Sequence, residues 1–422
     1  MRTVGIYTLG CKVNTYESEF IMNELKNHGY EIRDFNGVCD VYIINTCTVT
    51  NQSDSKSRKI IRQAIKNNPN ACVVAMGCFI AANPNYNESG IDILLGNKDK
   101  SKIVSLLDQY FQDRETIRLT YKERLKEFED MYIHDFPGRT RAFVKIQDGC
   151  DNFCSYCIIP FVRGKCRSKN EDKVVSEIEG LVANGYHEIV LTGIHTGSYG
   201  IDLNTSFAHL LNRLILIDGL NRLRISSIEV TELNDDVLSV IKNSNVLVDH
   251  LHIPLQAGSN EILKSMNRKY DLDFYKDKIQ EIRSIRPNIS ISTDVIVGFP
   301  GETEELFQQT IDTCREIAFS KLHVFPYSDR EGTAASRMSS KIDHHEKKER
   351  ARRLIEVSRE LECQYMNLFL HQEVEVLIEE VKDGYSYGHT GNYLLVKIKG
   401  KYPHNEFVKV VIQEVQYPYC IA

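Results

Sequence analysis

The chain has 422 residues, of which 42% are hydrophobic and 26% charged, and its formal net charge at pH 7 is −6. This length predicts two or three domains with large cores, and the composition excludes a low-complexity chain. The negative charge excludes a protein coated with RNA-binding charge, so contact with a phosphate backbone would come from local basic patches. No secretory signal pattern opens the sequence, and no apolar run approaches the ~18 residues of a membrane helix. We therefore expect a cytoplasmic protein that does not contact a membrane.

Strand-like apolar runs alternate with helical patterns in the first 113 residues. Strands are expected at 4–9, 41–44, 73–76 and 91–95, and helices at about 17–27 and 53–66, with a further helix ending near residue 111. This alternation predicts a parallel α/β domain of the Rossmann or flavodoxin-like kind over residues 1–113.

A second and longer alternation comes after a segment, 113–138, in which charges of both signs crowd together. We interpret that segment as a linker containing some helix. Strands are then expected at 142–146, 188–191, 223–228, 250–255, 290–297 and 321–325, and one long helix at 343–370. Six β/α units of this length predict a partial (β/α)6 barrel over residues 136–368.

The hydrophobic period changes to two near residue 373. Strands are expected at 373–378, 393–398 and 408–415, separated by glycine-containing turns. The pattern predicts a small antiparallel β-barrel over residues 369–422. This segment holds five Lys or Arg against seven Asp or Glu residues, which is an unexpected balance for a module that contacts RNA.

Cys150, Cys154 and Cys157 lie in one short loop, at gaps that let three thiolates reach a single metal centre. A [4Fe-4S] cube usually has four cysteine ligands, so three would leave one iron open for another molecule. The spacing is that of enzymes whose open iron is chelated by S-adenosylmethionine (SAM). A zinc site completed by Cys166 is the alternative, but zinc modules usually contain two C-x-x-C pairs and this chain has one. We therefore predict an iron–sulfur cluster with a catalytic role.

Cys11, Cys47 and Cys78 each directly follow an apolar strand run or lie within two residues of it. Because the carboxyl ends of parallel strands open onto one edge of a sheet, the three thiols could converge there. Small or hydroxylated neighbours leave room for a bulky ligand. The cysteines that lack this position are expected to be small buried or surface thiols.

Taken together, these segments resemble the radical SAM methylthiotransferases over nearly the whole chain. The matching runs begin at Thr8-Leu9-Gly10-Cys11-Lys12-Val13-Asn14 and Asn45-Thr46-Cys47-Thr48-Val49, and the cysteine loop continues to Arg163-Gly164. Later matches are Leu191 to Gly197, His252 to Ser259 and Gly298 to Thr303. The resemblance implies an auxiliary [4Fe-4S] cluster on Cys11, Cys47 and Cys78, a central radical SAM core and a C-terminal TRAM domain.

The resemblance also implies the reaction. The form Gly-Cys-Lys-Val-Asn and the segment Thr192 to Gly197 look like the branch that acts on threonylcarbamoyladenosine at tRNA position 37. Adenine C2–H has no useful acidity, so a radical from SAM would activate it. A second SAM would methylate a sulfur held at the auxiliary cluster. Besides two [4Fe-4S] clusters and SAM, the enzyme would need tRNA, a sulfur source and a one-electron reductant such as flavodoxin or ferredoxin.

The residues expected to contact SAM and RNA are chosen by their place in the sequence, near the cysteine loop, near predicted strand ends or in basic clusters. Candidate SAM-binding residues are Tyr156, Arg163, Glu229, Gln256, Gly298 and Gly301. Candidate RNA contacts are Lys56, Arg58, Lys59, Arg62, Arg139, Arg141 and the cluster from Lys347 to Arg353. His195, His252 and His323 are expected to be structural.

The sequence leaves three other functions open. One is methylthiolation of isopentenyladenosine at the same tRNA position, and another is methylthiolation of a ribosomal protein side chain. The third is a non-enzymatic iron–sulfur electron carrier or RNA-binding sensor.

Overall fold

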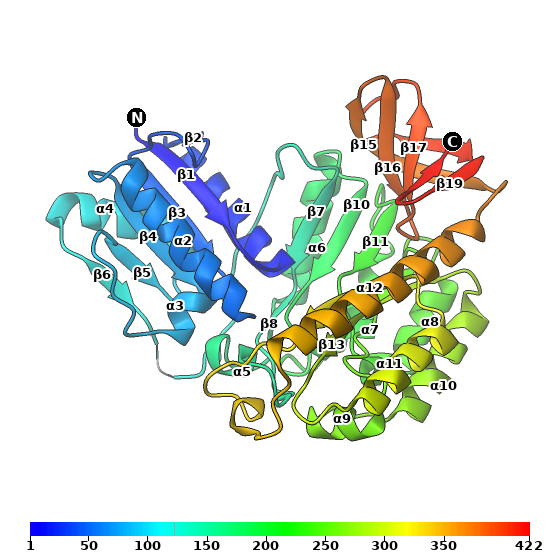
Figure 1. The fold of residues 1–422 in the computed structure, drawn as a ribbon. Coiled ribbons are helices and arrows are strands. Elements are labelled where there is room, and N and C mark those ends of the chain that lie inside the picture. Colours follow the sequence, from blue (N-terminus) through cyan, green and yellow to red (C-terminus); the bar gives the residue numbers. More distant parts are fainter. Residues whose placement is uncertain (122) are drawn as a thin grey trace.

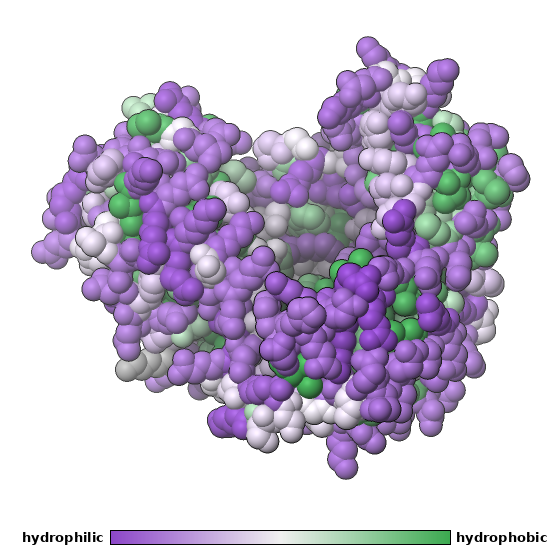
Figure 2. All heavy atoms as spheres, in the orientation of Figure 1, coloured by the Kyte–Doolittle hydropathy of each residue, from purple (hydrophilic) through white to green (hydrophobic). Residues whose placement is uncertain are grey.

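A computed structural model describes residues 1–121 and 123–422, which form three units arranged around a shared central hollow (Figures 1 and 2). An N-terminal α/β unit (blue to cyan in Figure 1) faces a central barrel (green to yellow), and a small β unit (red) lies against the barrel. No helix in these two described ranges is both long and apolar enough to span a bilayer.

The N-terminal unit is a doubly wound parallel sheet with strand order β2-β1-β3-β4-β5-β6. Its strands are β1 (Thr3–Thr8), β2 (Glu31–Arg33), β3 (Val41–Thr46), β4 (Cys72–Gly77), β5 (Ile93–Leu95) and β6 (Ile117–Leu119). Its helices are α1 (Lys12–Asn27), α2 (Asn51–Asn67), α3 (Cys78–Ala82) and α4 (Ile103–Asp113), the last preceded by the 3-10 turn η1 (Lys100–Lys102). Alternate residues of β3 pack in different cores, Ile43 with α1 and α4 and Ile44 with α2, so both faces are covered.

Three details of this unit differ from the sequence-based expectation. Helix α1 begins at Lys12 and not near residue 17, because Cys11 already has the extended backbone of an N-cap. The short strand β2 was not expected. A linker with some helix was expected at 113–138, of which residue 122 lies outside the described ranges. The described residues from 114 to 138 contain no helix. They instead include strand β6, which pairs with β5. The N-terminal sheet therefore continues to Leu119.

The central unit is the predicted partial barrel. Strands β7 (Arg141–Lys145), β10 (Glu188–Thr192) and β11 (Arg222–Ile225) form one parallel sheet, and β12 (His250–His252), β13 (Ser290–Val297) and β14 (Lys321–Pro326) form another. A parallel bridge between Leu223 and Leu247 connects the two sheets. The short pair β8 (Gln147–Asp148) and β9 (Arg167–Ser168) extends the barrel beside the cysteine loop.

Helices follow the barrel strands and cover their outer face (Figure 1). They are α5 (Ile159–Val162), α6 (Glu171–Ala183), α7 (Phe207–Leu214), α8 (Asp235–Asn243), α9 (Asn260–Ser265), α10 (Leu272–Ile285), α11 (Glu304–Ile317) and α12 (His344–Asn367), with 3-10 turns η2 (Thr196–Ser198), η3 (Val230–Glu232) and η4 (Ala335–Arg337). Side-chain caps fix several helix starts, since Asn170, Ser206 and Thr303 each accept a backbone N–H from three residues ahead.

The C-terminal unit is a curled six-stranded sheet with order β18-β15-β16-β17-β20-β19. Its strands are β15 (Glu373–Lys382), β16 (Tyr385–Thr390), β17 (Leu395–Lys399), β18 (Phe407–Val411), β19 (Glu414–Gln416) and β20 (Tyr419–Ile421). The predicted small antiparallel barrel is confirmed as a curled and mostly antiparallel sheet, with the addition that β17 pairs with β20 in parallel. A period-two pattern shows that strands exist and does not show which way neighbours run.

Candidate functional site

The cysteine loop lies between β8 and α5, and backbone contacts on several sides fix its path. Ser155 donates from its N–H to Met266 O at 2.9 Å, and Ala335 donates to Ser155 O at 2.7 Å. Gly149 begins the loop at φ +77°, where an added Cβ would lie 1.9 Å from Lys165 O. Only glycine suits this position, because it combines a positive φ with close approach of another backbone segment.

Cys150, Cys154 and Cys157 are half-buried in this loop and influence one another electrostatically. Burial, with the neighbouring Cys154 and Cys150 sulfurs, raises the pKa of Cys157 to about 12. Asn152 N–H donates to Cys150 Sγ at 3.5 Å, and Arg268 Nη1 donates to Cys154 Sγ at 3.3 Å. A metal binds cysteine as the thiolate, so metal binding at this loop would release the thiol protons.

The strand-end cysteines meet at one edge of the N-terminal sheet. Cys11 follows β1 and opens to solvent, Cys47 follows β3, and Cys78 begins α3 directly after β4. Gly10 has φ +100°, and a Cβ there would lie 3.0 Å from Cys47 Sγ. Burial, together with Cys78 and Cys11, raises the pKa of Cys47 to about 11. The predicted convergence of the three thiols at this edge is therefore present.

Within the described ranges, no three Cys, His, Asp or Glu side chains are close enough to hold a single metal ion. Each cysteine of a [4Fe-4S] site binds a different iron, so its ligands lie farther apart than donors around one ion. Cys166 instead faces His195 Nδ1 and Gly149 O, each at 3.8 Å from its sulfur. This geometry does not favour the zinc alternative.

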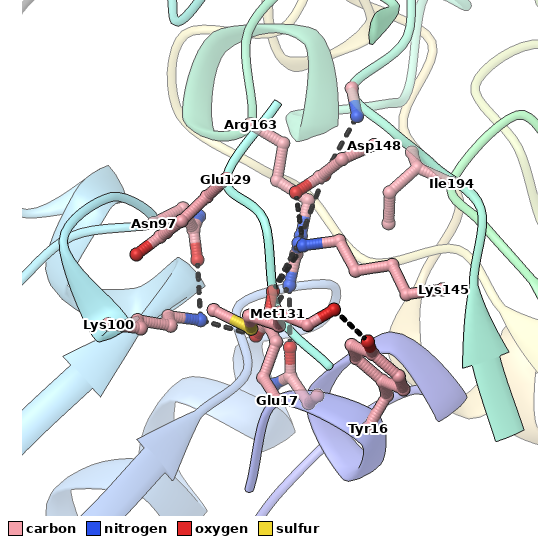
Figure 3. Close-up of polar contacts among 12 residues, drawn as sticks. Tyr16, Glu17, Asn97, Lys100, Glu129, Met131, Lys145, Asp148, Arg163 and Ile194 are labelled. Carbon is pink, nitrogen blue, oxygen red and sulfur yellow. Dashed lines mark hydrogen bonds and ion pairs between the residues drawn. The ribbon is translucent and has the colours of Figure 1, made fainter. Parts of the chain in front are cut away.

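A buried ionic network lies between helix α1 and the start of the barrel, where Figure 3 shows Glu17, Lys100, Lys145, Asp148 and Arg163 pointing toward one another. Glu17 Oε1 lies 3.0 Å from Lys145 Nζ and 3.1 Å from Arg163 Nη1, and Glu17 Oε2 also pairs with Lys100. Asp148 pairs with Lys145 at 2.8 Å and with Arg163 at 3.1 Å. All of these side chains are at most 3% exposed.

This network holds more positive than negative charge. Arg167 also pairs with Asp148, so Lys100, Lys145, Arg163 and Arg167 face the carboxylates of Glu17 and Asp148. Buried charges need counter-charges, because desolvation is otherwise too costly. Arg163 Nε donates to Cys78 Sγ at 3.3 Å, and the sulfurs of Cys78 and Cys11 raise the pKa of Arg163 against the effect of burial. Thiolates binding an anionic iron–sulfur cluster at this edge fit the excess positive charge.

The predicted SAM-binding residues do not all lie together. Tyr156 OH lies 3.5 Å from Arg268 Nη1, and the guanidinium of Arg268 pairs with Glu229. Glu229 and Arg268 also line a small cavity with Cys154 and Asn152, so these side chains surround the cysteine loop. Arg163 lies elsewhere, at the end of α5 and not at a strand end, fully buried in the ionic network against Cys78.

The other three candidates, Gln256, Gly298 and Gly301, share a backbone with positive φ. Gln256 has φ +68° and bridges to β13 through Val295. Gly298, at φ +70°, donates its N–H to Glu302 Oε2 at 2.6 Å, and a Cβ there would meet Lys347 Cγ at 2.2 Å. Gly301 has φ +87° and open space where a Cβ would be. The SAM-binding role of all six residues stays a prediction.

Several residues of the site were not predicted. Asn97 Nδ2 donates to Cys78 Sγ at 3.5 Å and to Val162 O at 2.9 Å, and Arg268 contacts the cysteine loop from a distant segment. Each is a lone polar residue far in sequence from its partner, so no local pattern marks it. His195 is a polar neighbour of the loop. Burial lowers the pKa of His195, but hydrogen bonds to Cys150, Cys166 and Glu232 raise this pKa by more.

The basic clusters differ in availability. On α12, Arg350 is buried against Glu302 at 2.7 Å, Arg352 pairs with Glu349 at 2.6 Å, and Arg353 pairs with Glu304 at 2.6 Å. Those cations are largely neutralised within the protein. Lys348 of α12 is exposed, as are Lys56 and Lys59 on α2, and none of the three makes an ion pair within the described ranges. These three lysines are therefore the candidate RNA contacts whose charge stays available.

Comparisons with known proteins agree with this site. A family model described as "Radical SAM superfamily" matches residues 144–314, and "Uncharacterized protein family UPF0004" matches residues 3–96. The solved structure of the radical SAM methyltransferase TsrM from Kitasatospora setae has a similar fold, with a TM-score of 0.56 at 15% identity over 77% of this chain and 73% of that chain. The cysteine loop, the partial barrel and these matches define a radical SAM enzyme.

Relatives define the family more narrowly. The chain is 44% identical, over 99% of its length and 95% of the relative's, to the Bacillus subtilis (strain 168) threonylcarbamoyladenosine tRNA methylthiotransferase MtaB. It is 37% identical, over 97% of its length and 100% of the relative's, to the Aquifex aeolicus MtaB. A tRNA-2-methylthio-N(6)-dimethylallyladenosine synthase from Clostridium botulinum (strain Langeland) is 35% identical over 90% of this chain and 87% of that protein. The chain belongs to the radical SAM methylthiotransferase family.

Proposed function

We propose that this chain adds a methylthio group to C2 of N6-threonylcarbamoyladenosine at position 37 of tRNA. The observation that carries the proposal is the pair of cysteine sites in a chain 44% identical to a relative named for this activity. Arg163, six residues after the cysteine loop, donates a hydrogen bond to Cys78 of the second site. One site alone would suit many radical SAM enzymes. A second three-cysteine site next to it suits an enzyme that also inserts sulfur.

Cys150, Cys154 and Cys157 would hold one [4Fe-4S] cluster, and Cys11, Cys47 and Cys78 would hold the other. With SAM bound, the clusters supply a one-electron route to an unactivated C–H bond and a place to hold sulfur. Within the chain, Arg268 and Asn152 donate hydrogen bonds to sulfurs of the first site, and Arg163 and Asn97 donate to Cys78 in the second. Such bonds orient ligands and tune a bound cluster.

The proposed reaction also requires partners that the chain does not contain. A one-electron reductant such as flavodoxin or ferredoxin and a sulfur source are required, and tRNA places the reaction in the cytoplasm. We propose that residues 1–113 carry the auxiliary cluster, 136–368 the radical chemistry and 369–422 a TRAM module. Lys56 and Lys59 on α2 and Lys348 on α12 are the RNA contacts that the charge distribution favours.

Comparison of tRNA nucleosides from cells with and without the gene tests the proposal. In cells without the gene, we expect the methylthio derivative of threonylcarbamoyladenosine to be lost and threonylcarbamoyladenosine itself to be retained. An unchanged level of the methylthio derivative would refute it. Loss of the methylthio derivative of dimethylallyladenosine would favour the activity for which the Clostridium botulinum relative is named. If neither nucleoside changes, a ribosomal protein acceptor is the next candidate. A non-enzymatic electron carrier or RNA-binding sensor would be recognised because the reduced protein would release no 5′-deoxyadenosine from SAM.

A further inference from the structure

Residues from all three units meet beside Cys11. Lys12 is the first residue of α1, which packs against β7 of the barrel. Arg224 on β11 and His250 on β12 come from the barrel, and Tyr393 comes from the turn between β16 and β17. The ring of Tyr393 lies 3.7 Å from Arg224 Cζ and 4.5 Å from the His250 ring.

Lys12 has no counter-charge at bonding distance. It is half-buried and, within the described ranges, makes no hydrogen bond and no ion pair. Burial and the guanidiniums of Arg224 and Arg141 lower the pKa of Lys12, against the opposing effect of the Asp294 carboxylate. Like charges held together out of water are unfavourable, so a protein that keeps them together gains when an anion binds.

Arg224 and His250 each have a buried polar atom without a partner. Arg224 is fully buried; its Nε pairs with Glu188 at 2.9 Å and its Nη1 donates to Gly391 O at 2.9 Å, while Nη2 has no partner in the described ranges. His250 contacts Ser292 Oγ through Nε2 at 3.0 Å, and its Nδ1 has no partner there either. Buried groups of this kind are almost always satisfied, and an unfilled ligand site is one explanation for an exception.

The nearby carboxylates are already engaged. Glu188 is shared among Arg224, Arg222 and Arg141, Glu379 pairs with Arg141 and His389, and Asp294 lies 3.3 Å from His252. The unsatisfied polar groups therefore belong to Lys12, Arg224 and His250, next to Cys11 of the auxiliary site, and His250 Nδ1 donates when it carries the ring proton.

We propose that Lys12, Arg224 and His250 bind the carboxylate of the N6-threonylcarbamoyl group and so select this base over adenines whose N6 substituent is neutral. The inference rests on the proposed function and adds its specificity determinant. The threonylcarbamoyl group carries a carboxylate, whereas a dimethylallyl group is an uncharged hydrocarbon. A site built of buried polar donors rejects a neutral analogue strongly, because its donors would stay unpaired. A phosphate of the RNA backbone is the other anion that these donors could bind.

Binding of anticodon stem-loop RNAs to the reconstituted holoenzyme separates these sources. Three RNAs are compared by fluorescence anisotropy: one with threonylcarbamoyladenosine at position 37, one with its neutral methyl ester, and one with unmodified adenosine. We expect the acid to bind about tenfold more tightly than the ester, as one charge-assisted hydrogen bond provides. Lys12→Met should remove most of this ratio, and Lys12→Arg should keep it. Lys26→Met, an exposed lysine in the last turn of α1, is the matched control and should leave the ratio unchanged.

Two results would overturn the inference. One is equal binding of acid and ester by the unaltered enzyme. The other is weakening of all three RNAs by the same factor in Lys12→Met, which would indicate a phosphate contact. Iron content of the Lys12→Met protein shows whether the neighbouring Cys11 site is intact. Failure of the proposed function appears separately in the nucleoside comparison of cells, since an enzyme without this anion site can still methylthiolate the base.

Discussion

Cys78 has two side-chain donors on its sulfur, Arg163 Nε at 3.3 Å and Asn97 Nδ2 at 3.5 Å. Both donors come from outside α3, and Arg163 lies six residues after the cysteine loop in sequence. The chain segment that contains the cysteine loop therefore also supplies a hydrogen-bond donor to the second site. Because that guanidinium also pairs with Glu17 and Asp148, its position is fixed from several directions.

Replacement of Cys78 tests the existence of the second cluster. We expect Cys78→Ala, purified and reconstituted without oxygen, to bind about four irons where the unaltered protein binds about eight, because one of two cubes loses a ligand. Iron analysis and the electronic absorption of the clusters provide the measurement. Cys363→Ala, which alters a half-buried cysteine of α12 away from both sites, is the control and should keep the full content. Full iron content in Cys78→Ala would refute the assignment.

At the scale of secondary-structure elements, the sites depend on where each strand ends and on the residues directly after it. The positions of the six candidate cysteines could be predicted because each follows a strand-like run or shares a recognisable spacing, and their role as cluster ligands stays a prediction. Their supporting residues could not, since Glu17 and Lys100 meet only when α1 packs beside η1. Strand β16 was also missed. Gly388 interrupts its pattern, and the structure shows why glycine is there: a Cβ would lie 2.0 Å from Leu377 O on the paired strand.

Gly149, in the loop before α5, and Gly185, between α6 and β10, provide a matched pair of glycine substitutions. Gly149 and Gly185 both have positive φ, at +77° and +89°, so an alanine strains the backbone at either position. At Gly149 the new Cβ would lie 1.9 Å from Lys165 O, whereas at Gly185 nothing lies within 4 Å. We expect Gly149→Ala to lose about four irons, the content of one cube, and all SAM cleavage, and Gly185→Ala to keep both. Equal behaviour of the two proteins would contradict this role for the turn.

At the scale of the whole molecule, the C-terminal unit is held to the barrel by polar contacts. Arg222 donates to Glu375 O at 2.8 Å, and Arg224 donates to Gly391 O at 2.9 Å. Arg141 pairs with Glu379 at 3.0 Å. The order of the three units and the six barrel strands could be predicted from periodicity. Their contacts could not, because they depend on single arginines whose partners lie more than 150 residues away.

Acid should weaken this attachment. The pKa of Glu379 is below its ordinary value. Burial alone would raise this pKa, but the neighbouring cationic groups of His389, Arg141 and Arg224 lower it by more. A carboxylate whose folded-state pKa is lowered stabilises the docked form above its unfolded pKa, roughly 4, and loses that contribution as pH falls through the folded value. Hydrogen exchange of strands β15 and β16 should therefore accelerate below about pH 4 in the unaltered protein.

Glu379→Gln should remove this part of the pH dependence and accelerate exchange already at neutral pH, because Arg141 loses its carboxylate partner. Glu406→Gln changes an exposed carboxylate of the same unit and should match the unaltered protein. If Glu379→Gln retained the full acid response, the attachment would depend on other groups.

The most direct test of the whole account offers the purified holoenzyme two RNAs at once, with dithionite as reductant and sulfide as sulfur source. One anticodon stem-loop carries threonylcarbamoyladenosine at position 37, and the other carries dimethylallyladenosine. Mass spectrometry then measures the methylthio product of each, and release of 5′-deoxyadenosine shows that the enzyme is active. The account predicts a methylthio product from the threonylcarbamoyladenosine RNA alone. Active SAM cleavage with no such product, or with product mainly from the dimethylallyladenosine RNA, would contradict it.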